Sequence, residues 1–248
     1  SPAFGRRPPA PAREFPVVWE DEVLIALDKP AGVAVHGGSG VSFGVIEQLR
    51  RQRPDARMLE LAHRLDRETS GLLIVAKKRS ALTRLHDAFR GGEINKRYLA
   101  LVKGCWHNPV QNVRLPLLKY LTAGGERRVS VSTEGKEAHS IVRLLVCWQN
   151  FSLVEVELKT GRTHQIRVHL SHLGFPLAGD DKYGDFSWNK TLQKAGLRRM
   201  FLHAAKLVFQ HPLDEDRKIA LEASLPQELR SFIDQIECHE ERAYGEAF

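Results

Sequence analysis

Apolar and polar positions alternate along the chain in patterns that predict both strands and helices. Short apolar runs bounded by glycine, proline and polar residues are typical of strands, since about four to eight residues are enough to cross a sheet. The most continuous of these runs directly follows Gly71. Strand character is predicted for residues 22–27, 72–78, 95–103, 137–148, 151–160, 201–210 and 218–223.

Four other segments repeat apolar residues every three or four positions, which predicts helices with one buried face. Ser80 is placed to cap a helix over residues 81–90, because its hydroxyl can accept a free amide proton of the first turn. Thr163 is placed in the same way before a helix that Gly174 ends. The remaining two helices are predicted at residues 43–53 and 226–236.

Size and composition indicate one globular body. The chain has 248 residues, of which 42% are hydrophobic and 27% are charged, values typical of a soluble protein. No apolar run approaches the roughly 20 residues that a membrane span needs. Residues 1–15 are rich in proline, alanine and arginine and are predicted to form a linker or disordered arm. The folded body is predicted at 16–240 and a C-terminal tail at 241–248.

Basic residues outnumber acidic ones and favour a polyanionic partner. The formal net charge is +7 and the isoelectric point is about 9.4, although many basic proteins bind no nucleic acid. Residues 121–133 contain two glycines, Arg127 and Arg128, and then an alternating pattern that predicts a basic hairpin. Such a hairpin can reach RNA phosphates, but exposed hairpins also carry arginine for solubility.

The three cysteines indicate no covalent framework. Cys105, Cys147 and Cys238 lie far apart in the sequence and show neither a disulfide pattern nor zinc-ligand spacing. A reducing, cytoplasmic compartment is therefore expected.

One short stretch, from His63 to Gly71, carries the strongest chemical signal. In it a single carboxylate, Asp66, lies between Arg64 and Arg67 and precedes a turn and a buried strand. The flanking guanidinium groups favour the ionised form of Asp66, which suits a nucleophile better than a general acid. Taken by itself, the pattern is also compatible with a turn-capping carboxylate paired with arginines in water.

The sequence from His63 to Gly71 resembles the signature of the RluA-type pseudouridine synthases, His-Arg-Leu-Asp followed after two residues by Thr-Ser-Gly. Residues 36–47 are most similar to the RluC branch of that family, the bacterial enzymes that modify large-subunit ribosomal RNA. Such proteins usually carry an S4-type RNA-binding domain ahead of a linker, and the catalytic domain without it is expected here. Further stretches that agree with the family are 28–32, 96–102, 161–169, 180–184 and 202–205.

The resemblance implies an α+β fold built on a large mixed, mostly antiparallel sheet flanked by helices. It also implies three catalytic residues. Asp66 acts at the sugar, Tyr98 holds the base and helps to remove its C5 proton, and Arg167 keeps the carboxylate ionised and oriented. From pattern alone, Tyr98 would be interpreted as a strand residue packed in the core. Neither a cofactor nor a metal is expected, because the reaction is an isomerisation.

The expected RNA contacts surround these three residues. A base inside folded RNA must leave its stack to be modified, and Arg64 is expected to fill the vacated space. The other candidates for substrate or RNA contact are His63, Lys29, Arg127, Arg128 and Arg162.

Two polar clusters were considered as metal sites. His164, His169 and His172 lack the spacing of a zinc-binding helix and point in different directions around it, so structural or RNA-contacting roles are expected. A polar loop predicted at 180–188 could bind a divalent metal through Asp180, Asp181 and Asp185, but no companion carboxylate cluster or phosphate-loop motif supports a cation site there.

The expected function is isomerisation of specific uridines to pseudouridine in RNA, most closely in the large-subunit (23S) ribosomal RNA of bacteria, by a monomer. Three alternatives stay open. One is a synthase that acts on transfer RNA, and a second is a non-catalytic RNA-binding module of the same fold. A glycoside hydrolase is the third, but it normally needs two carboxylates across the scissile bond, and only Asp66 lies in the motif.

Overall fold

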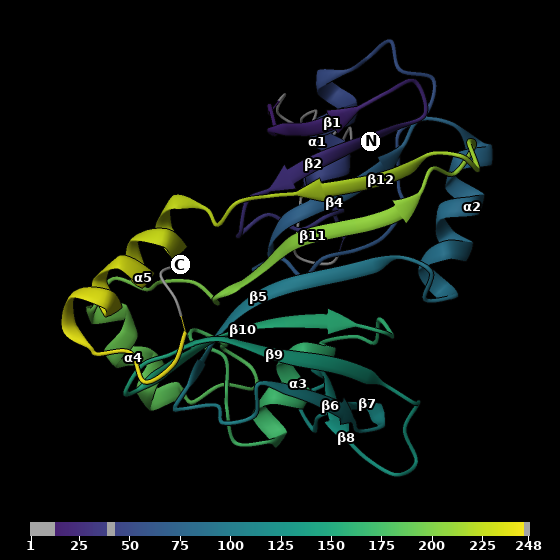
Figure 1. Cartoon of the computed structure of the whole chain (residues 1–248). Coiled ribbons are helices and arrows are strands. Elements are labelled where there is room, and N and C mark those ends of the chain that lie inside the picture. Colours follow the sequence, from purple (N-terminus) through teal and green to yellow (C-terminus); the bar gives the residue numbers. More distant parts are fainter. Residues whose placement is uncertain (1–12, 39–42, 246–248) are drawn as a thin grey trace, which may run out of the picture.

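A large twisted sheet forms the centre of the computed structural model, which describes residues 13–38 and 43–245 (Figure 1). Within these residues, ten strands join one sheet. Its main path is β1 (Val17–Glu20), β2 (Leu24–Lys29), β4 (Ser70–Ala76), β11 (Leu202–Gln210), β5 (Asn95–Lys103), β10 (Phe151–Leu158), β9 (His139–Cys147) and β6 (Val110–Arg114). Two further strands pair beside this path, β12 (Lys218–Glu222) with β11 and β3 (Glu60–Leu61) with β4.

Neighbouring strands of the sheet run antiparallel with one exception among the described pairings. Strands β4 and β11 run parallel, with Ser70 opposite His203 and Gly71 opposite Ala204. A large mixed, mostly antiparallel sheet is therefore confirmed. This parallel pair lies near the middle of the sheet. Its strand β4 directly follows the loop that carries Asp66.

Five helices in the described residues cover the sheet and close its cores, so the α+β class is also confirmed. Helix α2 contributes Leu82 and Leu85 to the core over β2 and β4. Figure 1 shows α4 and α5 together at one end of the sheet, where Leu192 and Phe232 share a core. The helices are α1 (Val45–Gln52), α2 (Arg79–Arg90), α3 (Gln165–His172), α4 (Phe186–Lys194) and α5 (Gln227–His239). None of them is long and apolar enough to cross a membrane.

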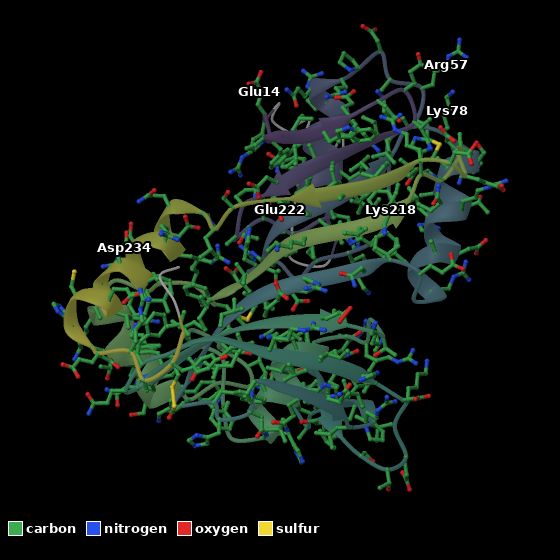
Figure 2. The ribbon with its side chains drawn as sticks, in the orientation of Figure 1. Glu14, Arg57, Lys78, Lys218, Glu222 and Asp234 are labelled. Atoms are coloured by element: carbon green, nitrogen blue, oxygen red, sulfur yellow. A yellow bond between two sulfur atoms is a disulfide. The ribbon has the colours of Figure 1, made fainter. Side chains whose placement is uncertain are left out.

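Strand β12 shows how the sequence pattern directs its side chains. Ile219 and Leu221 are buried in a core, whereas the alternating residues are exposed. Lys218 and Glu222, labelled in Figure 2, are two of the exposed residues. The period of two thus places apolar side chains on one face of the strand, as predicted.

The predicted basic hairpin forms a separate two-stranded sheet, β7 (Leu117–Leu121) with β8 (Arg127–Val131). It packs on the body through Val129, which shares a small core with Val168 of α3. The outer end of the hairpin, near Leu121 and Arg127, is exposed.

Several predicted boundaries and elements were wrong. Ser80 lies inside α2, whose N-cap is Lys78, and helix α3 begins after His164 rather than at Thr163. The loop predicted at 180–188 ends in a helix, because Asp185 accepts a hydrogen bond from the Trp188 amide and caps α4. Three short strands, β1, β3 and β6, were not predicted, since runs of so few residues carry little periodicity.

The body extends past both predicted limits. Phe15 is buried in a core, although it falls in the predicted arm. In the predicted tail, the Ala243 amide donates to the Cys147 carbonyl, and the Tyr244 carbonyl accepts from the Cys147 amide. Residues 1–12 and 246–248 lie outside the described residues.

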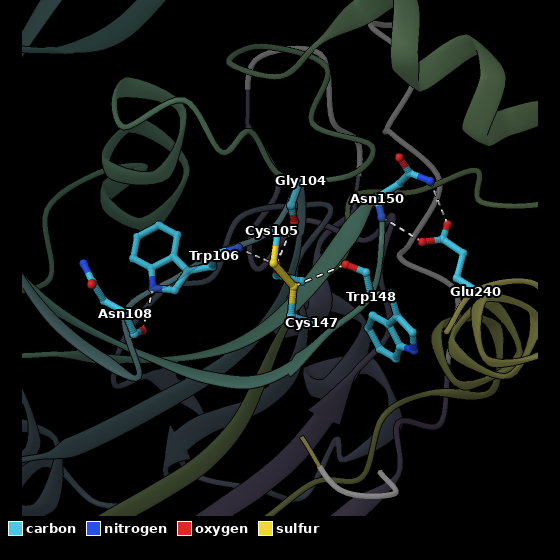
Figure 3. Close-up of a disulfide and its surroundings, with 9 residues drawn as sticks. Gly104, Cys105, Trp106, Asn108, Cys147, Trp148, Asn150 and Glu240 are labelled. Carbon is cyan, nitrogen blue, oxygen red and sulfur yellow. Dashed lines mark hydrogen bonds between the residues drawn. A yellow bond between two sulfur atoms is a disulfide. The ribbon is translucent and has the colours of Figure 1, made fainter. Parts of the chain in front are cut away.

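A disulfide joins Cys105 to Cys147, so the expectation of three unpaired cysteines was wrong (Figure 3). Cys105 follows β5 and Cys147 ends β9, and both strands pair with β10, which lies between them. The fold thereby brings the two Cα atoms to 5.7 Å across 42 residues of sequence. Cysteine usage therefore no longer indicates a reducing compartment.

Gly71 marks a close approach of backbones beside the Asp66 loop. Its φ of 115° is a conformation that favours glycine. A Cβ at this position would overlap the carbonyl oxygen and amide nitrogen of Ala204 on β11. Glycine is therefore required both by the backbone angle and by the neighbouring strand.

We predict that Gly71→Ala lowers the free energy of unfolding by about 3 kcal/mol or more, because angular strain and steric overlap act together. The matched control is Gly174→Ala. Gly174 has a similar φ of 89°, but its Cβ would meet open space, so only about 1–2 kcal/mol of strain is expected. Urea unfolding of the two variants measures the difference, and equal stabilities would contradict the steric constraint.

Candidate active site

A groove of about 1510 Å³ runs between the Asp66 loop, strand β5, helix α3 and the β7–β8 hairpin. Asp66 is the one carboxylate among the residues that line it. The lysines and arginines that line it come from all of these elements and from the turns beside them: Arg64, Arg67, Arg90, Lys96, Lys119, Arg127, Arg128, Lys159, Arg162 and Arg167. Such a surface attracts a polyanion and leaves one acidic group to act on it.

The structure brings Asp66, Tyr98 and Arg167 to the same groove from three distant parts of the chain. Asp66 precedes β4, Tyr98 lies on β5, and Arg167 lies on α3. The Arg167 Nη1 donates to Asp66 Oδ2 at 3.2 Å. The flanking arginines do not pair with this carboxylate, contrary to expectation. The Arg67 Nε donates to the Gly32 carbonyl instead, and Arg64 has no ionic or hydrogen-bonding partner in the described residues.

Asp180, rather than Asp66, is the main partner of Arg167. The Arg167 Nε and Nη2 donate to the two Asp180 carboxylate oxygens at 2.9 and 2.8 Å, a bidentate arrangement. Burial alone would lower the pKa of Arg167, but the hydrogen bonds and negative charges of Asp180 and Asp66 outweigh it and raise that pKa. The arginine therefore stays charged in its buried position.

Asp180 is itself held by the chain that follows it. Its Oδ1 accepts from the amides of Lys182 and Tyr183. Burial would raise the pKa of Asp180, yet its hydrogen bonds and the charge of Arg167 lower it. Sequence reasoning considered this residue only as a metal ligand. Its agreement with the family stretch 180–184 was the signal that could have assigned it to the site.

The other acidic residues near this loop are also engaged. Asp185 caps α4 and pairs with Lys103 at 2.6 Å. Within the part of the chain that the structure describes, no three His, Cys, Asp or Glu side chains are grouped so as to hold a metal ion. Asp181 is exposed, with its Oδ1 3.6 Å from Arg167.

Tyr98 faces the groove with its ring against two hydrophobic cores. Burial and the nearby charge of Asp66 raise its pKa, so the phenol is protonated at neutral pH. Its hydroxyl forms no hydrogen bond with any described residue, which leaves it available to a ligand in the groove.

Lys29 was expected among the phosphate contacts, and its position is incompatible with that role. The side chain is fully buried, and its Nζ donates to the carbonyls of Pro30, Val33 and Arg67. All three ammonium protons are thus used within the protein. Burial lowers the pKa of Lys29 to about 7. The bond to the Arg67 carbonyl instead ties the Asp66 loop to the turn after β2.

His63 was expected to contact RNA, but its Nε2 and its ring both make contacts within the protein. Its Nε2 accepts from the Ile74 amide at 2.9 Å, and its ring stacks on Phe89 with centroids 4.4 Å apart. Burial lowers the pKa of His63 to about 3, in keeping with a neutral acceptor. We therefore infer that His63 supports the Asp66 loop and does not make the expected RNA contact.

The remaining basic candidates differ in whether their guanidinium groups already have partners within the described residues. Arg64 and Arg127 are exposed and have no ionic or hydrogen-bonding partner in the described residues. Arg128 donates to the Lys182 carbonyl and to Glu126, which fixes the hairpin on the body. The Arg162 Nε donates to the Glu137 carbonyl. Arg64 and Arg127 are thus the candidates best placed to contact phosphate.

His164, which was not among the predicted site residues, lines the groove beside Asp66. Its Nε2 lies 3.8 Å from Asp66 Oδ1, which is the carboxylate oxygen to which Arg167 does not donate. His169, in contrast, is buried between Ser140 and the Leu115 carbonyl and has a structural role.

Comparison with known proteins agrees with this fold. A model of the RNA pseudouridylate synthase family matches residues 23–172. The ribosomal large subunit pseudouridine synthase C of Yersinia pestis is 51% identical over 214 residues, which are 86% of this chain and 67% of that protein. The protein of the same name from Escherichia coli (strain K12) is 53% identical over 198 residues, 79% of this chain and 62% of that protein. The chain thus spans about two thirds of the length of these relatives.

Two solved structures share the fold. Human RNA Pseudouridylate Synthase Domain Containing 4 superposes with a TM-score of 0.74 at 25% identity, over 93% of this chain and 94% of that one. Human RNA Pseudouridylate Synthase Domain Containing 1 gives 0.70 at 22% identity, over 98% and 100%. The fold is therefore that of a pseudouridine synthase. Together with the family model and the bacterial relatives, it shows that the chain belongs to the RNA pseudouridylate synthase family.

We predict that Asp180→Asn destabilises the protein by about 3–5 kcal/mol at pH 7, because it leaves a buried guanidinium without its main counter-charge. The exposed neighbour offers a matched control, and Asp181→Asn is expected to change stability by less than about 0.5 kcal/mol. Since the pKa of Asp180 is lowered in the folded state, its contribution is complete above its ordinary value of 3.8 and is lost as the pH falls through the lower value.

Urea unfolding at a series of pH values measures this difference. The difference in unfolding free energy between wild type and Asp180→Asn is expected to become smaller only at acidic pH. A variant as stable as Asp181→Asn at pH 7 would show that Asp180 does not hold Arg167.

Proposed function

We propose that the protein converts uridine to pseudouridine in RNA, and specifically in bacterial large-subunit ribosomal RNA. The observation that carries the proposal is the single carboxylate of the basic groove, Asp66, oriented by Arg167 and lining the same groove as Tyr98. The printed names of the bacterial relatives support the choice of ribosomal RNA as substrate. Activity on transfer RNA, the alternative, has no such support.

The reaction is an isomerisation, in which the bond from N1 of uracil to C1′ of ribose breaks and one from C5 to C1′ forms. The C5 proton leaves and N1 gains a proton, so that no electron is gained or lost overall. No co-reactant enters the balance, and the proposal therefore includes no cofactor.

Asp66 acts at the sugar in this proposal. Its Oδ2 is held by Arg167, while its Oδ1 is free to approach the ribose. A carboxylate there can attack C1′, stabilise positive charge on the ring or remove a ribose proton. All three routes use the carboxylate as an anion, and the hydrogen bond from Arg167 orients it.

Tyr98 serves the detached base. Its ring offers a surface against which uracil can rotate, and its hydroxyl is placed to assist removal of the C5 proton. A protonated phenol is a poor base by itself, so in this step the hydroxyl gives its proton to the uracil, where N1 gains one overall, and accepts the C5 proton in its place. Burial and the nearby negative charge of Asp66 raise the pKa of Tyr98 and so increase the basicity of its phenolate.

The rest of the groove binds folded RNA. The target base must leave its stack to reach Asp66. In this proposal the vacated position is occupied by Arg64, which is exposed and has no ionic or hydrogen-bonding partner in the described residues. We further propose that the protein works in the cytoplasm, where ribosomal RNA is found, and as a monomer, since Asp66, Tyr98 and Arg167 of the same chain meet in one groove.

We predict that Asp66→Asn retains RNA binding but forms no pseudouridine, because the amide preserves shape and removes the charge. Purified variants are incubated with unmodified ribosomal RNA, which is then digested to nucleosides and separated by chromatography. Mass alone would not separate the two nucleosides, since they are isomers. Asp181→Asn should retain activity, and product from Asp66→Asn would contradict the assignment. A wild type that binds the RNA without forming product would favour the non-catalytic binding module.

The groove also predicts the salt dependence of binding. Each lost phosphate contact is expected to reduce the slope of log affinity against log salt by about 0.7–0.9. Arg127→Ala should show this reduction, because its guanidinium is free for phosphate. Arg57, labelled in Figure 2, is exposed away from the groove, and Arg57→Ala is the control. Equal slopes for the two variants would exclude Arg127 from the RNA contact.

A further inference from the structure

His164 has an unusual backbone conformation for its residue type. Its φ of 54° and ψ of 23° place it in the left-handed region, and it is the one non-glycine residue with positive φ in the described part of the chain. Such a conformation costs about 1–3 kcal/mol and is common at functional sites. It occurs at the N-cap of α3, three residues before Arg167.

Hydrogen bonds fix which nitrogen of the His164 ring carries the proton. The Val129 amide donates to the Tyr183 hydroxyl at 3.0 Å, and that hydroxyl lies 2.7 Å from His164 Nδ1. If Nδ1 carried the proton, the Tyr183 oxygen would accept two N–H groups and its own proton would have no partner in the described residues. The hydroxyl therefore donates to Nδ1, and the neutral ring carries its proton on Nε2.

The Nε2 proton has no hydrogen-bond acceptor among the described residues. Asp66 Oδ1 lies 3.8 Å from Nε2, which is too far for a hydrogen bond. One hydroxyl oxygen can lie at about 2.8 Å from both atoms, where it accepts from Nε2 and donates to Oδ1. Burial lowers the pKa of His164, in agreement with a neutral ring that donates a single proton.

Ribose offers a hydroxyl in this position. In a β-nucleoside the 2′-hydroxyl and the base lie on opposite faces of the sugar ring. A carboxylate that acts at C1′ from the face opposite the base therefore has the 2′-hydroxyl beside it. The 2′-hydroxyl is both donor and acceptor, as the pair of His164 and Asp66 requires.

We propose that His164 binds the 2′-hydroxyl of the target ribose together with Asp66 and so selects a ribonucleotide over a deoxyribonucleotide. This inference rests on the proposed function, because it places the target sugar at Asp66. Tyr183 is then a positioning residue, since its hydroxyl sets the tautomer and orientation of the ring. Its ring also lies under the Arg167 guanidinium, with 5.2 Å from Cζ to the ring centroid.

The test compares two substrates in the wild type and in several variants. The substrates are a short RNA that contains a uridine which the enzyme modifies, located by analysis of sequence-specific fragments of the treated ribosomal RNA, and the same RNA with 2′-deoxyuridine at that one position. The ratio of their kcat/KM values is measured for each enzyme. Comparison of ratios removes the intrinsic reactivity of the deoxynucleotide, which is common to all the enzymes.

The variants are chosen for backbone and atom position. Asparagine tolerates the left-handed conformation but places its amide near the position of Nδ1, away from the sugar. Glutamine carries its amide nitrogen near the position of Nε2. His172 is exposed on the same helix and does not line the groove, so His172→Ala is the matched control. Thermal unfolding and RNA binding confirm that each variant is folded.

Wild type is expected to prefer the ribonucleotide, and His164→Asn should reduce the preference by roughly tenfold, the value of a hydrogen bond to a charged or polar partner. His164→Gln should keep most of it, and Tyr183→Phe should lose part of it. An unchanged ratio in His164→Asn, with equal losses on both substrates, would overturn the inference and leave the proposed function intact. A wild type inactive on the all-ribonucleotide RNA would overturn both.

Discussion

The ionic contact of Arg167 with two carboxylates is the interaction on which the site depends. It joins helix α3 to the Asp66 loop and to the turn that holds Asp180, three segments that no other charged side chain connects in the described residues. A guanidinium this deeply buried would be strongly destabilising without such partners. The same requirement that holds these segments together also fixes the position of Asp66. Stability of the fold and orientation of the carboxylate therefore arise from one set of contacts.

The two carboxylates differ because of their surroundings. The Asp180 side chain is 1% exposed, accepts two backbone amides and faces two N–H groups of Arg167. The Asp66 side chain is 32% exposed and receives a single N–H. The first is saturated with hydrogen bonds, while the second keeps an oxygen for another molecule. Exposure and unused acceptors, more than charge, distinguish the group that can act on a substrate.

Much of the fold followed from the sequence, because hydrophobic periodicity reflects burial directly. Strand β5 was predicted with its observed limits, and Asp66, Tyr98 and Arg167 came from matching motifs. What periodicity could not supply was the identity of partners. The pairing of Cys105 with Cys147 depends on how the strands are ordered in the sheet, and the contact of Arg167 with Asp180 depends on how the loop after α3 folds back on that helix. A lysine at the end of a strand is usually exposed, and the three carbonyl acceptors of Lys29 make its burial possible here.

Helix α3 shows how a small local strain is compensated by its neighbours. His164 would adopt an ordinary helical conformation if the helix began one residue earlier, with Thr163 as its N-cap, as the sequence predicts. It is kept in place by the Tyr183 hydroxyl and by the amide of Val129 behind it, so the hairpin, the 180–184 turn and the helix N-terminus form one connected unit. Because Arg128 of the hairpin also donates to the Lys182 carbonyl, two hydrogen bonds join the hairpin to the turn that carries Tyr183. The backbone strain at His164 and the attachment of the hairpin therefore depend on the same residue, Tyr183.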